Sequence, residues 1–377
     1  MLTTESKHTP PDWVRAAVTE QDFLLEQAQL GQVWTFVGYV QDIPDNNDWM
    51  RVDLAGRSVV VQRFGSSIKA FENICQHRFH PIRVTPRGNG PLSCGFHGWQ
   101  YDQEGRAAMV PKCKEMFGCT PDALQMRLNV VEVDICGSLI FARFGTGPGL
   151  REWLAESFDI MQYLTRAATK DGEVSQLVDS HWKFMLEITL DDYHVVAVHP
   201  KSFGKNGHTP MSRINYFKMG EHSALIPSGR SPDSLEKVLA ECQAGQFVPF
   251  GYMIFQIFPT LIFVVFHAIN LFGDSYWFGM TEHMQPQTHK QTRITSRYYM
   301  LPLPEAGWWR RILRALLKPV ILFFVKKNLL QIFMEDHVVC AHQQTIAHQI
   351  RGERKISAQE SRVSWFAATY AKFVRFK

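Results

Sequence analysis

Two short cysteine–histidine motifs constrain this chain more than any other feature of its sequence. The first is Cys75-x-His77 and the second is Cys94-x-x-His97, with eighteen residues between the two cysteines. Thiolates and imidazoles at such short spacings are typical metal ligands. The sequence therefore predicts a metal site with two Cys and two His ligands.

Two kinds of metal site use these ligands. In a Rieske [2Fe-2S] site, two thiolates hold one iron and two imidazoles hold the other, which raises the reduction potential above that of an all-cysteine cluster. A structural zinc site binds the same residue types. We favour the cluster, because zinc knuckles seldom occur in a stretch as strand-rich as Leu92 to Tyr101 and predict no second metal site downstream.

A second set of candidate ligands follows the pattern Glu187-x3-Asp191-x2-His194-x4-His199-Pro200. The spacing predicts that residues 187, 191 and 194 share one face of a helix. Pro200 disfavours α geometry at His199, so the helix should end there and leave this imidazole free to turn toward His194. Two His and one carboxylate form a facial triad that leaves positions on Fe(II) open for dioxygen.

Asp336 is the predicted third ligand of this triad. It lies in a predicted long helix, Lys327 to Ile350, at the centre of an apolar face, whereas Glu335 lies toward the edge of that face. A carboxylate in an apolar stripe needs a metal or a cation. Two alternatives stay open: an Asp satisfied by donors such as Gln343, and a hydrogen-bonded histidine pair at a helix end.

The predicted organisation is two domains of an α+β protein. The 377 residues are 45% hydrophobic, enough for two substantial cores. A Gly/Pro-rich linker near residue 148 divides an N-terminal antiparallel β domain, residues 1–148, from a C-terminal domain, residues 149–377. The predicted strands of the first domain are Val33 to Val40, Ser58 to Phe64, Lys69 to Asn73, Leu92 to Tyr101 and Leu128 to Phe144.

These motifs together resemble the terminal oxygenase (alpha) subunits of the Rieske non-heme iron ring-hydroxylating oxygenases, over essentially the whole chain. The resemblance implies one [2Fe-2S] cluster and one Fe(II) per subunit, and a helix-grip-like C-terminal domain with an antiparallel sheet flanked by helices. The implied ligands are Cys75, His77, Cys94 and His97 for the cluster and His194, His199 and Asp336 for the iron.

The resemblance also assigns roles to residues near the iron. Asp191 resembles the catalytic acid that hydrogen-bonds an iron-ligating His in its own subunit and a cluster His of the neighbouring subunit. Glu187 and Tyr193 are expected directly behind the ligands. Two positions depart from the family pattern: Phe79 replaces a glycine after the first motif, and Ile188 replaces an Asn. The chain length resembles that of homotrimers built from alpha subunits alone.

The implied activity is hydroxylation, by mono- or dioxygenation with O2, of a mainly apolar, aromatic small molecule. Oxidative N- or O-demethylation uses the same iron site, and a simple Rieske electron carrier is a further alternative that needs no second metal. The chain has no GxGxxG motif at a strand-to-helix junction, so electrons should come from a ferredoxin and/or an NAD(P)H-dependent flavin reductase.

The predicted substrate contacts come from residues 243–273, which contain no Asp, Glu, Lys or Arg. This composition favours a neutral aromatic or alicyclic ligand in an apolar cavity. Most aromatic residues there should belong to the core of a sheet. The predicted contacts are Phe247, Tyr252, Phe255, Phe263, Phe266 and His267.

Charge and targeting signals suggest a cytoplasmic protein that does not bind nucleic acid. The net charge of +4 is spread without long basic blocks. The N-terminus lacks the apolar region of a secretory signal, and the cysteines outside the cluster fit a reducing compartment. The basic, amphipathic segment Trp308 to Val325 is interpreted as a lid or packing helix at the mouth of the site, in preference to a membrane-surface contact.

The cluster assignment has a direct spectroscopic test. Because two ligands are imidazoles, the reduced protein should give the electron paramagnetic resonance spectrum of a histidine-ligated [2Fe-2S] centre. An all-cysteine spectrum, or metal analysis that finds zinc alone, would contradict the Rieske interpretation.

Overall fold

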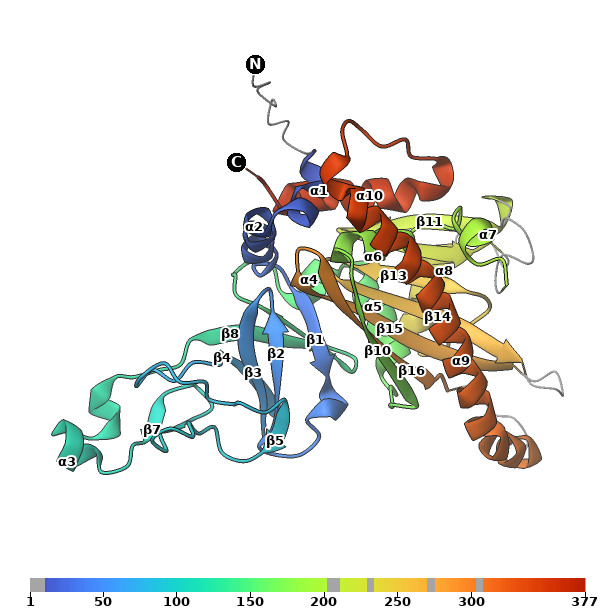
Figure 1. Ribbon diagram of the computed structural model, residues 1–377. Coiled ribbons are helices and arrows are strands. Elements are labelled where there is room, and N and C mark those ends of the chain that lie inside the picture. Colours follow the sequence, from blue (N-terminus) through green and yellow to red (C-terminus); the bar gives the residue numbers. More distant parts are fainter. Residues whose placement is uncertain (1–10, 202–210, 229–233, 270–274, 303–307, 377) are drawn as a thin grey trace, which may run out of the picture. The chain divides into compact units, whose positions relative to one another are not determined.

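The computed structural model describes residues 11–201, 211–228, 234–269, 275–302 and 308–376. The chain forms two compact units, Gly31–Glu152 and the combination of Met1–Leu30 with Trp153–Lys377. Each unit contains a seven-stranded antiparallel sheet (Figure 1). The α+β fold with antiparallel sheets is therefore confirmed.

The first unit is built on the sheet order β1-β9-β8-β4-β3-β2-β5, with β6 and β7 as a separate pair. Its elements are β1 (Thr35–Tyr39), β2 (Asp48–Leu54), β3 (Arg57–Phe64), β4 (Ser67–Glu72), β5 (Arg87–Asn89), β6 (Gln100–Tyr101), β7 (Ala107–Met109), α3 (Cys113–Phe117), β8 (Val130–Cys136) and β9 (Leu139–Arg143).

Two predicted strands of this unit need correction. The stretch Leu92 to Tyr101 is mainly a loop, because its backbone closes on itself: the N–H of Cys94 donates to Trp99 O at 2.8 Å. The stretch Leu128 to Phe144 is a hairpin rather than one strand, since Gly137 adopts φ 60° between β8 and β9. The remaining predicted strands correspond to β1, β3 and β4.

The second unit is built on the sheet order β10-β16-β15-β14-β13-β12-β11. Its strands are β10 (Gly172–Val178), β11 (Ile214–Met219), β12 (His222–Pro227), β13 (Met253–Ile257), β14 (Leu261–Ile269), β15 (Ser275–Thr288) and β16 (Gln291–Met300). The helices of this unit are α1 (Asp12–Val18), α2 (Glu20–Leu30), α5 (Glu156–Thr165), α6 (Trp182–Ile188), α7 (Val195–Val198), α8 (Ser234–Gln243), α9 (Trp308–Ile346) and α10 (Ser361–Phe373). The division between the two units falls within α4 (Leu150–Leu154).

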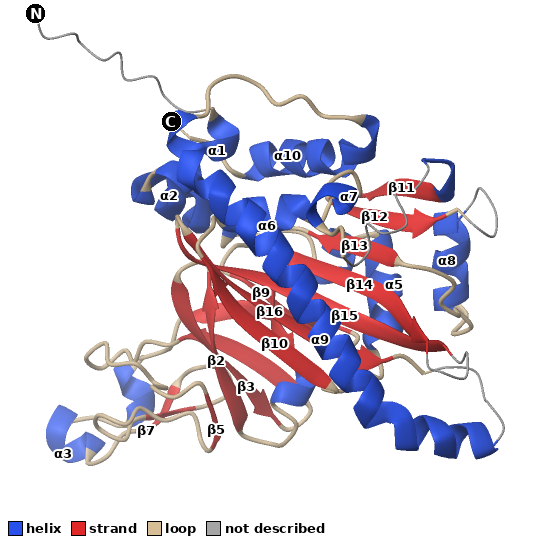
Figure 2. Ribbon diagram, turned by 45° about the vertical axis from the view of Figure 1, so that its right-hand side comes forward, coloured by secondary structure: helices blue, strands red, loops and turns tan. Residues whose placement is uncertain are grey.

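Helix α9 crosses one face of this sheet (Figure 2). It is one continuous helix that contains Pro319, so the predicted helix beginning at Lys327 starts too late. Helix α5 contacts the other face, where the Tyr299 hydroxyl donates to Leu164 O at 3.0 Å. In the part of the chain that the structure describes, no helix has both the length and the apolar character needed to cross a membrane.

The predicted domain boundaries were wrong in one respect, because the N-terminal extension does not accompany the first β unit. Helices α1 and α2 belong to the unit that contains the second sheet. The fully buried carboxyl of Glu26, in α2, accepts hydrogen bonds from Trp182 Nε1 at 2.9 Å and from the Tyr370 hydroxyl. His181 Nε2 lies 3.3 Å from the same carboxyl. These polar contacts fix the N-terminal helices to α6 and α10.

Replacing Glu26 should strongly destabilise the protein. Glu26→Ala leaves the Trp182, Tyr370 and His181 donors buried without an acceptor, which should lower the free energy of unfolding by about 3–5 kcal/mol. Urea denaturation measures this change. Gln21→Ala, at an exposed position of the same helix, is the control and should change stability by less than about 0.5 kcal/mol. Equal small effects of both variants would contradict the structural role of Glu26.

Candidate metal centres and cavity

The two cysteine–histidine motifs lie on neighbouring loops of the first unit. The Cys75 and Cys94 side chains are each only 2% exposed. The His77 ring stacks on Trp99, with 4.7 Å between ring centroids, and lies 4.5 Å from the His97 ring. Nδ1 of His77 is buried and has no hydrogen-bond partner among the described residues. Two buried thiols, two adjacent imidazoles and an unpaired ring nitrogen fit a [2Fe-2S] cluster.

Backbone and hydroxyl groups surround the two sulfurs. The Tyr101 hydroxyl lies 3.1 Å from Cys75 Sγ. Burial raises the pKa of the Cys94 thiol, and hydrogen bonds from the backbone N–H groups of Phe96 and His97 oppose this rise. Such hydrogen bonds stabilise charge on a sulfur ligand and tune the reduction potential of a cluster.

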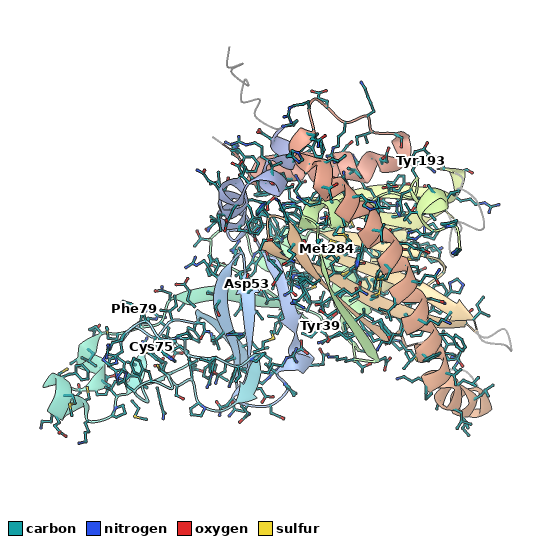
Figure 3. All side chains as sticks on the ribbon, viewed as in Figure 1. Tyr39, Asp53, Cys75, Phe79, Tyr193 and Met284 are labelled. Carbon is teal, nitrogen blue, oxygen red and sulfur yellow. The ribbon has the colours of Figure 1, made fainter. Side chains whose placement is uncertain are left out.

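Phe79 occupies the loop position at which the family pattern has glycine. Its φ is +57°, a left-handed conformation that is uncommon for a residue with a side chain. The N–H of Phe79 donates to Cys75 O at 2.9 Å, and the two residues lie close together in Figure 3. Phe79 therefore places a 73% exposed ring beside the cluster motif.

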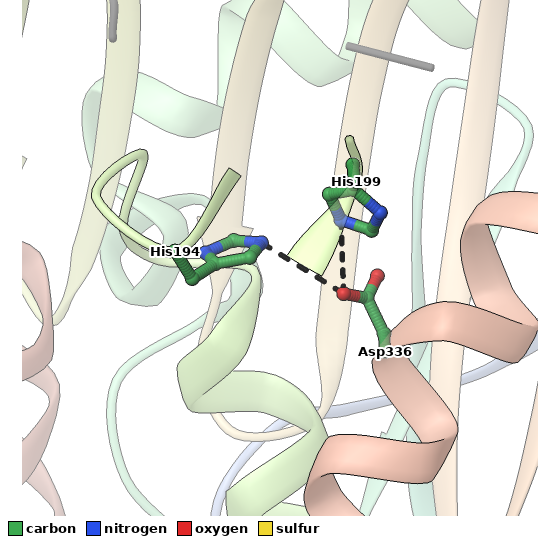
Figure 4. Close-up of side chains that lie close together, drawn as sticks. All are labelled: His194, His199 and Asp336. Atoms are coloured by element: carbon green, nitrogen blue, oxygen red, sulfur yellow. Dashed lines mark ion pairs between the residues drawn. The ribbon is translucent and has the colours of Figure 1, made fainter. Parts of the chain in front are cut away.

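The mononuclear site is assembled from a turn and a helix that are distant in sequence. Helix α6 ends at Ile188, and the carboxylate of Asp191 accepts the backbone N–H of His194 at 2.9 Å, which begins a separate short helix. His199 follows α7 with φ −113°, as expected of a residue before proline. Asp336 approaches both imidazoles from α9 (Figure 4).

One oxygen of Asp336 faces both imidazoles. Its Oδ1 lies 3.0 Å from His199 Nε2 and 3.8 Å from His194 Nε2. The three ligand atoms all lie within 4.8 Å of one another. Asp336 Oδ1 is buried and accepts no well-aligned hydrogen bond from the described residues. A convergent set of two nitrogens and one such oxygen fits the two-histidine, one-carboxylate arrangement that binds Fe(II).

Each imidazole is held from behind by a second carboxylate. Asp191 Oδ1 lies 3.0 Å from His194 Nδ1, and Glu335 Oε2 lies 2.7 Å from His199 Nδ1. These contacts orient the rings so that both Nε2 atoms face Asp336. Burial lowers the pKa of His199, but Asp336 and Glu335 together outweigh burial and raise it above its ordinary value.

A cavity of about 950 Å³ opens beside the three converging side chains. Its floor consists of side chains from β13, β14 and β15, and α9 forms the opposite wall. The α9 residues on that wall run from Leu317 to Asp336, so the part of the segment Trp308 to Val325 from Leu317 onward lies against the cavity. The lining is mainly aliphatic and aromatic, as ligand sites for small apolar molecules commonly are.

Three of the six predicted substrate contacts line the cavity: Tyr252, Phe266 and His267. The other three do not. Phe255 and Phe263 pair across β13 and β14 on the opposite face of the sheet and are fully buried. Phe247 packs against Tyr163, with 6.2 Å between ring centroids. Composition alone does not tell which face of a strand Phe255 and Phe263 occupy, and Phe247 lies outside the strands.

The two residues expected behind the iron ligands lie elsewhere. Glu187 forms an ion pair with Arg354 and does not line the cavity. Tyr193 is 56% exposed, near α7 (Figure 3). The expected common helical face of residues 187–194 does not form, since the chain turns after Ile188.

Two carboxyl groups of the site were missed in the sequence. Glu335 was placed at the edge of its helical face, yet its long side chain reaches His199. Glu282, on β15, lies on the cavity floor, and no motif in the sequence points to it. Burial, with a smaller contribution from the charge of Asp336, raises the pKa of Glu282 to about 8.

Known proteins resemble this chain in sequence. The curated relatives include the alpha subunit of 2-aminobenzenesulfonate 2,3-dioxygenase from Alcaligenes sp, 30% identical over 43% of this chain, and the large subunit of anthranilate 1,2-dioxygenase from Burkholderia cepacia, 28% identical over 52%. The matched segments cover 43% and 47% of these relatives, so this chain matches less than half of the length of each.

Solved structures share the fold over nearly the whole chain. Naphthalene 1,2-dioxygenase from Rhodococcus sp., bound to indole, superimposes with a TM-score of 0.74 at 17% identity, covering 95% of this chain and 93% of that one. The quaternary ammonium Rieske monooxygenase CntA, with a bound inhibitor, has a TM-score of 0.73 at 14% identity, with 96% and 94% covered.

Family models match both units. Residues 33–130 match the Rieske [2Fe-2S] domain, and residues 165–375 match the catalytic domain of the ring hydroxylating alpha subunit. The second match alone spans more than half of the chain. The protein therefore belongs to the ring-hydroxylating alpha subunit family, with a domain for a Rieske [2Fe-2S] cluster followed by a catalytic domain for mononuclear iron.

Proposed function

We propose that this protein is a terminal oxygenase that hydroxylates a mainly apolar small molecule. The observation that carries the proposal is the position of His194, His199 and Asp336, which converge at the side of a largely apolar cavity of about 950 Å³. An electron carrier needs neither a second metal site nor such a cavity. Demethylation would use the same site, and product analysis separates it from hydroxylation.

We infer that the residues described above hold the two cofactors. Cys75, Cys94, His77 and His97 would hold the [2Fe-2S] cluster, and His194, His199 and Asp336 would hold Fe(II). The cluster would supply single electrons, and the iron would supply dioxygen activation. Asp191 and Glu335 fix the two imidazoles in the tautomer that presents Nε2 to the metal. The aliphatic lining holds the substrate and excludes water from the iron.

Asp191 is proposed to link the two metal centres of neighbouring subunits. Its Oδ1 already accepts a hydrogen bond from the backbone N–H of His194 and lies within hydrogen-bond distance of Nδ1 of the same residue. No hydrogen bond from the described residues reaches Oδ2, so this oxygen can accept one from a cluster histidine of another subunit. This arrangement requires a multimer, and a homotrimer is the proposed state. A ferredoxin and/or an NAD(P)H-dependent flavin reductase would supply the electrons.

Loss of any iron ligand should abolish turnover but preserve the cluster. His194→Ala and Asp336→Ala remove ligands of one metal only, so product formation should fall more than about 100-fold while the [2Fe-2S] spectrum is unchanged. Incubation with reductant, a ferredoxin–reductase pair and ¹⁸O2, followed by mass spectrometry, measures oxygen incorporation. His342→Ala, at an exposed site of α9, is the control. Full turnover of an iron-loaded ligand variant would exclude that residue from the site.

The role of Glu335 can be tested by iron affinity. Glu335→Gln removes the charged acceptor that holds His199 Nδ1, so the protein should bind Fe(II) about 10–100-fold more weakly. Anaerobic titration of iron-depleted protein with Fe(II) gives this affinity without turnover. Glu353→Gln makes the same chemical change at an exposed carboxyl outside the site and should leave the affinity unchanged. An unchanged affinity in Glu335→Gln would show that His199 needs no carboxylate behind it.

A further inference from the structure

Glu282 is the only acid among the described residues on the floor of the cavity. Alternate side chains of three strands form it, because successive residues of a strand point to opposite faces of the sheet. On β15 the residues of this face are Phe278, Met280, Glu282 and Met284. The cross-strand neighbour of Glu282 on β14 is Ile262. Along β15 and toward β14, Glu282 is therefore surrounded by large apolar side chains, and Ser296 is its neighbour on β16.

Glu282 is buried without a partner of its own. It is 6% exposed, and no residue in the described ranges donates a hydrogen bond to its carboxyl or forms an ion pair with it. A buried carboxyl without a donor is costly, and such groups in native proteins commonly have a function. Because Glu282 lies on the cavity floor, a bound ligand can supply the missing donor.

The charges around the cavity indicate the kind of donor. Among the described residues that line it, four are acids and none is Lys or Arg; the acids are Asp191, Asp192, Glu282 and Asp336. Asp336 and Asp191 already face the histidines. Glu282 lies on β15 of the sheet and, among the described residues, forms no hydrogen bond or ion pair with a histidine. The absence of Lys and Arg from the described lining disfavours a carboxylated or sulfonated ligand, and the carboxyl of Glu282 favours a ligand with a cationic hydrogen-bond donor.

We propose that Glu282 is a specificity-determining residue that binds the protonated amino group of the substrate, so that the substrate class is a basic amine that carries an aromatic or alicyclic ring. The inference rests on the proposed function, because it places the oxygenase substrate in this cavity. It also refines the expectation of a neutral ligand: the aliphatic lining holds the ring system, and Glu282 accepts hydrogen bonds from the nitrogen. The contact would orient one edge of the ring toward the iron ligands.

Equilibrium binding to the complete protein tests the proposal without turnover. Three probes of similar shape are titrated calorimetrically under anaerobic conditions: 2-naphthylmethylamine, 2-naphthalenemethanol and 2-methylnaphthalene. The wild-type protein should bind the amine about 10–100-fold more tightly than 2-methylnaphthalene, as expected for a hydrogen bond to a charged group. Glu282→Gln should abolish most of this preference and leave the affinity for 2-methylnaphthalene within about 3-fold, which also shows that the variant is folded.

Control variants and outcomes separate this inference from the proposed function. Glu173→Gln makes the same change on β10 of the same sheet, at a residue that does not line the cavity, and should keep the wild-type preference. Glu282→Met places a third methionine between Met280 and Met284 on the same face of β15. This variant should bind 2-methylnaphthalene more tightly than it binds the amine. Equal binding of all three probes to the wild-type protein, or equal binding of alcohol and amine, would overturn the amine assignment. Amine selectivity that depends on Glu282 in a protein without oxygenase activity would support the inference and contradict the proposed function.

Discussion

The catalytic unit depends on one carboxylate oxygen that faces two imidazoles. Asp336 Oδ1 lies 3.0 Å and 3.8 Å from two ring nitrogens that belong to a turn more than 130 residues earlier in the chain. Three negatively charged groups around two imidazoles would repel one another in an apolar interior unless a cation were present. Helix α9, the break after α6 and the paired carboxylates Asp191 and Glu335 all serve to maintain this arrangement.

The sequence predicted those parts of the site that are local in the chain. Spacing within a few residues is enough to recognise the two cysteine–histidine motifs and the pair His194 and His199. Asp336 was found because a carboxylate at the centre of an apolar helical face is unusual. Glu187 was misplaced because the Asp191 side chain binds the backbone of His194 and breaks the helix, a competition that helical periodicity does not include.

The parts that could not be predicted depend on long side chains and on strand pairing. Glu335 lies at the edge of its helical face, but three rotatable bonds let its carboxylate reach His199. The face that a strand residue occupies follows from the register with its neighbours, and an apolar stretch such as residues 253–269 carries no period-2 signal. For this reason Phe255 and Phe263 could not be distinguished from Phe266, nor Glu282 from an ordinary surface acid.

The alternation along β13, β14 and β15 has a consequence for how this protein can be changed. Odd-numbered residues such as Phe255 and Phe263 stabilise the interior, whereas even-numbered residues such as Ile254, Val264 and Met280 contact the ligand space. The two sets alternate along the same strands, but their side chains lie on opposite faces of the sheet. A library that varies only the even-numbered lining positions can therefore alter the shape of the cavity while the side chains on the opposite face of the sheet remain unchanged.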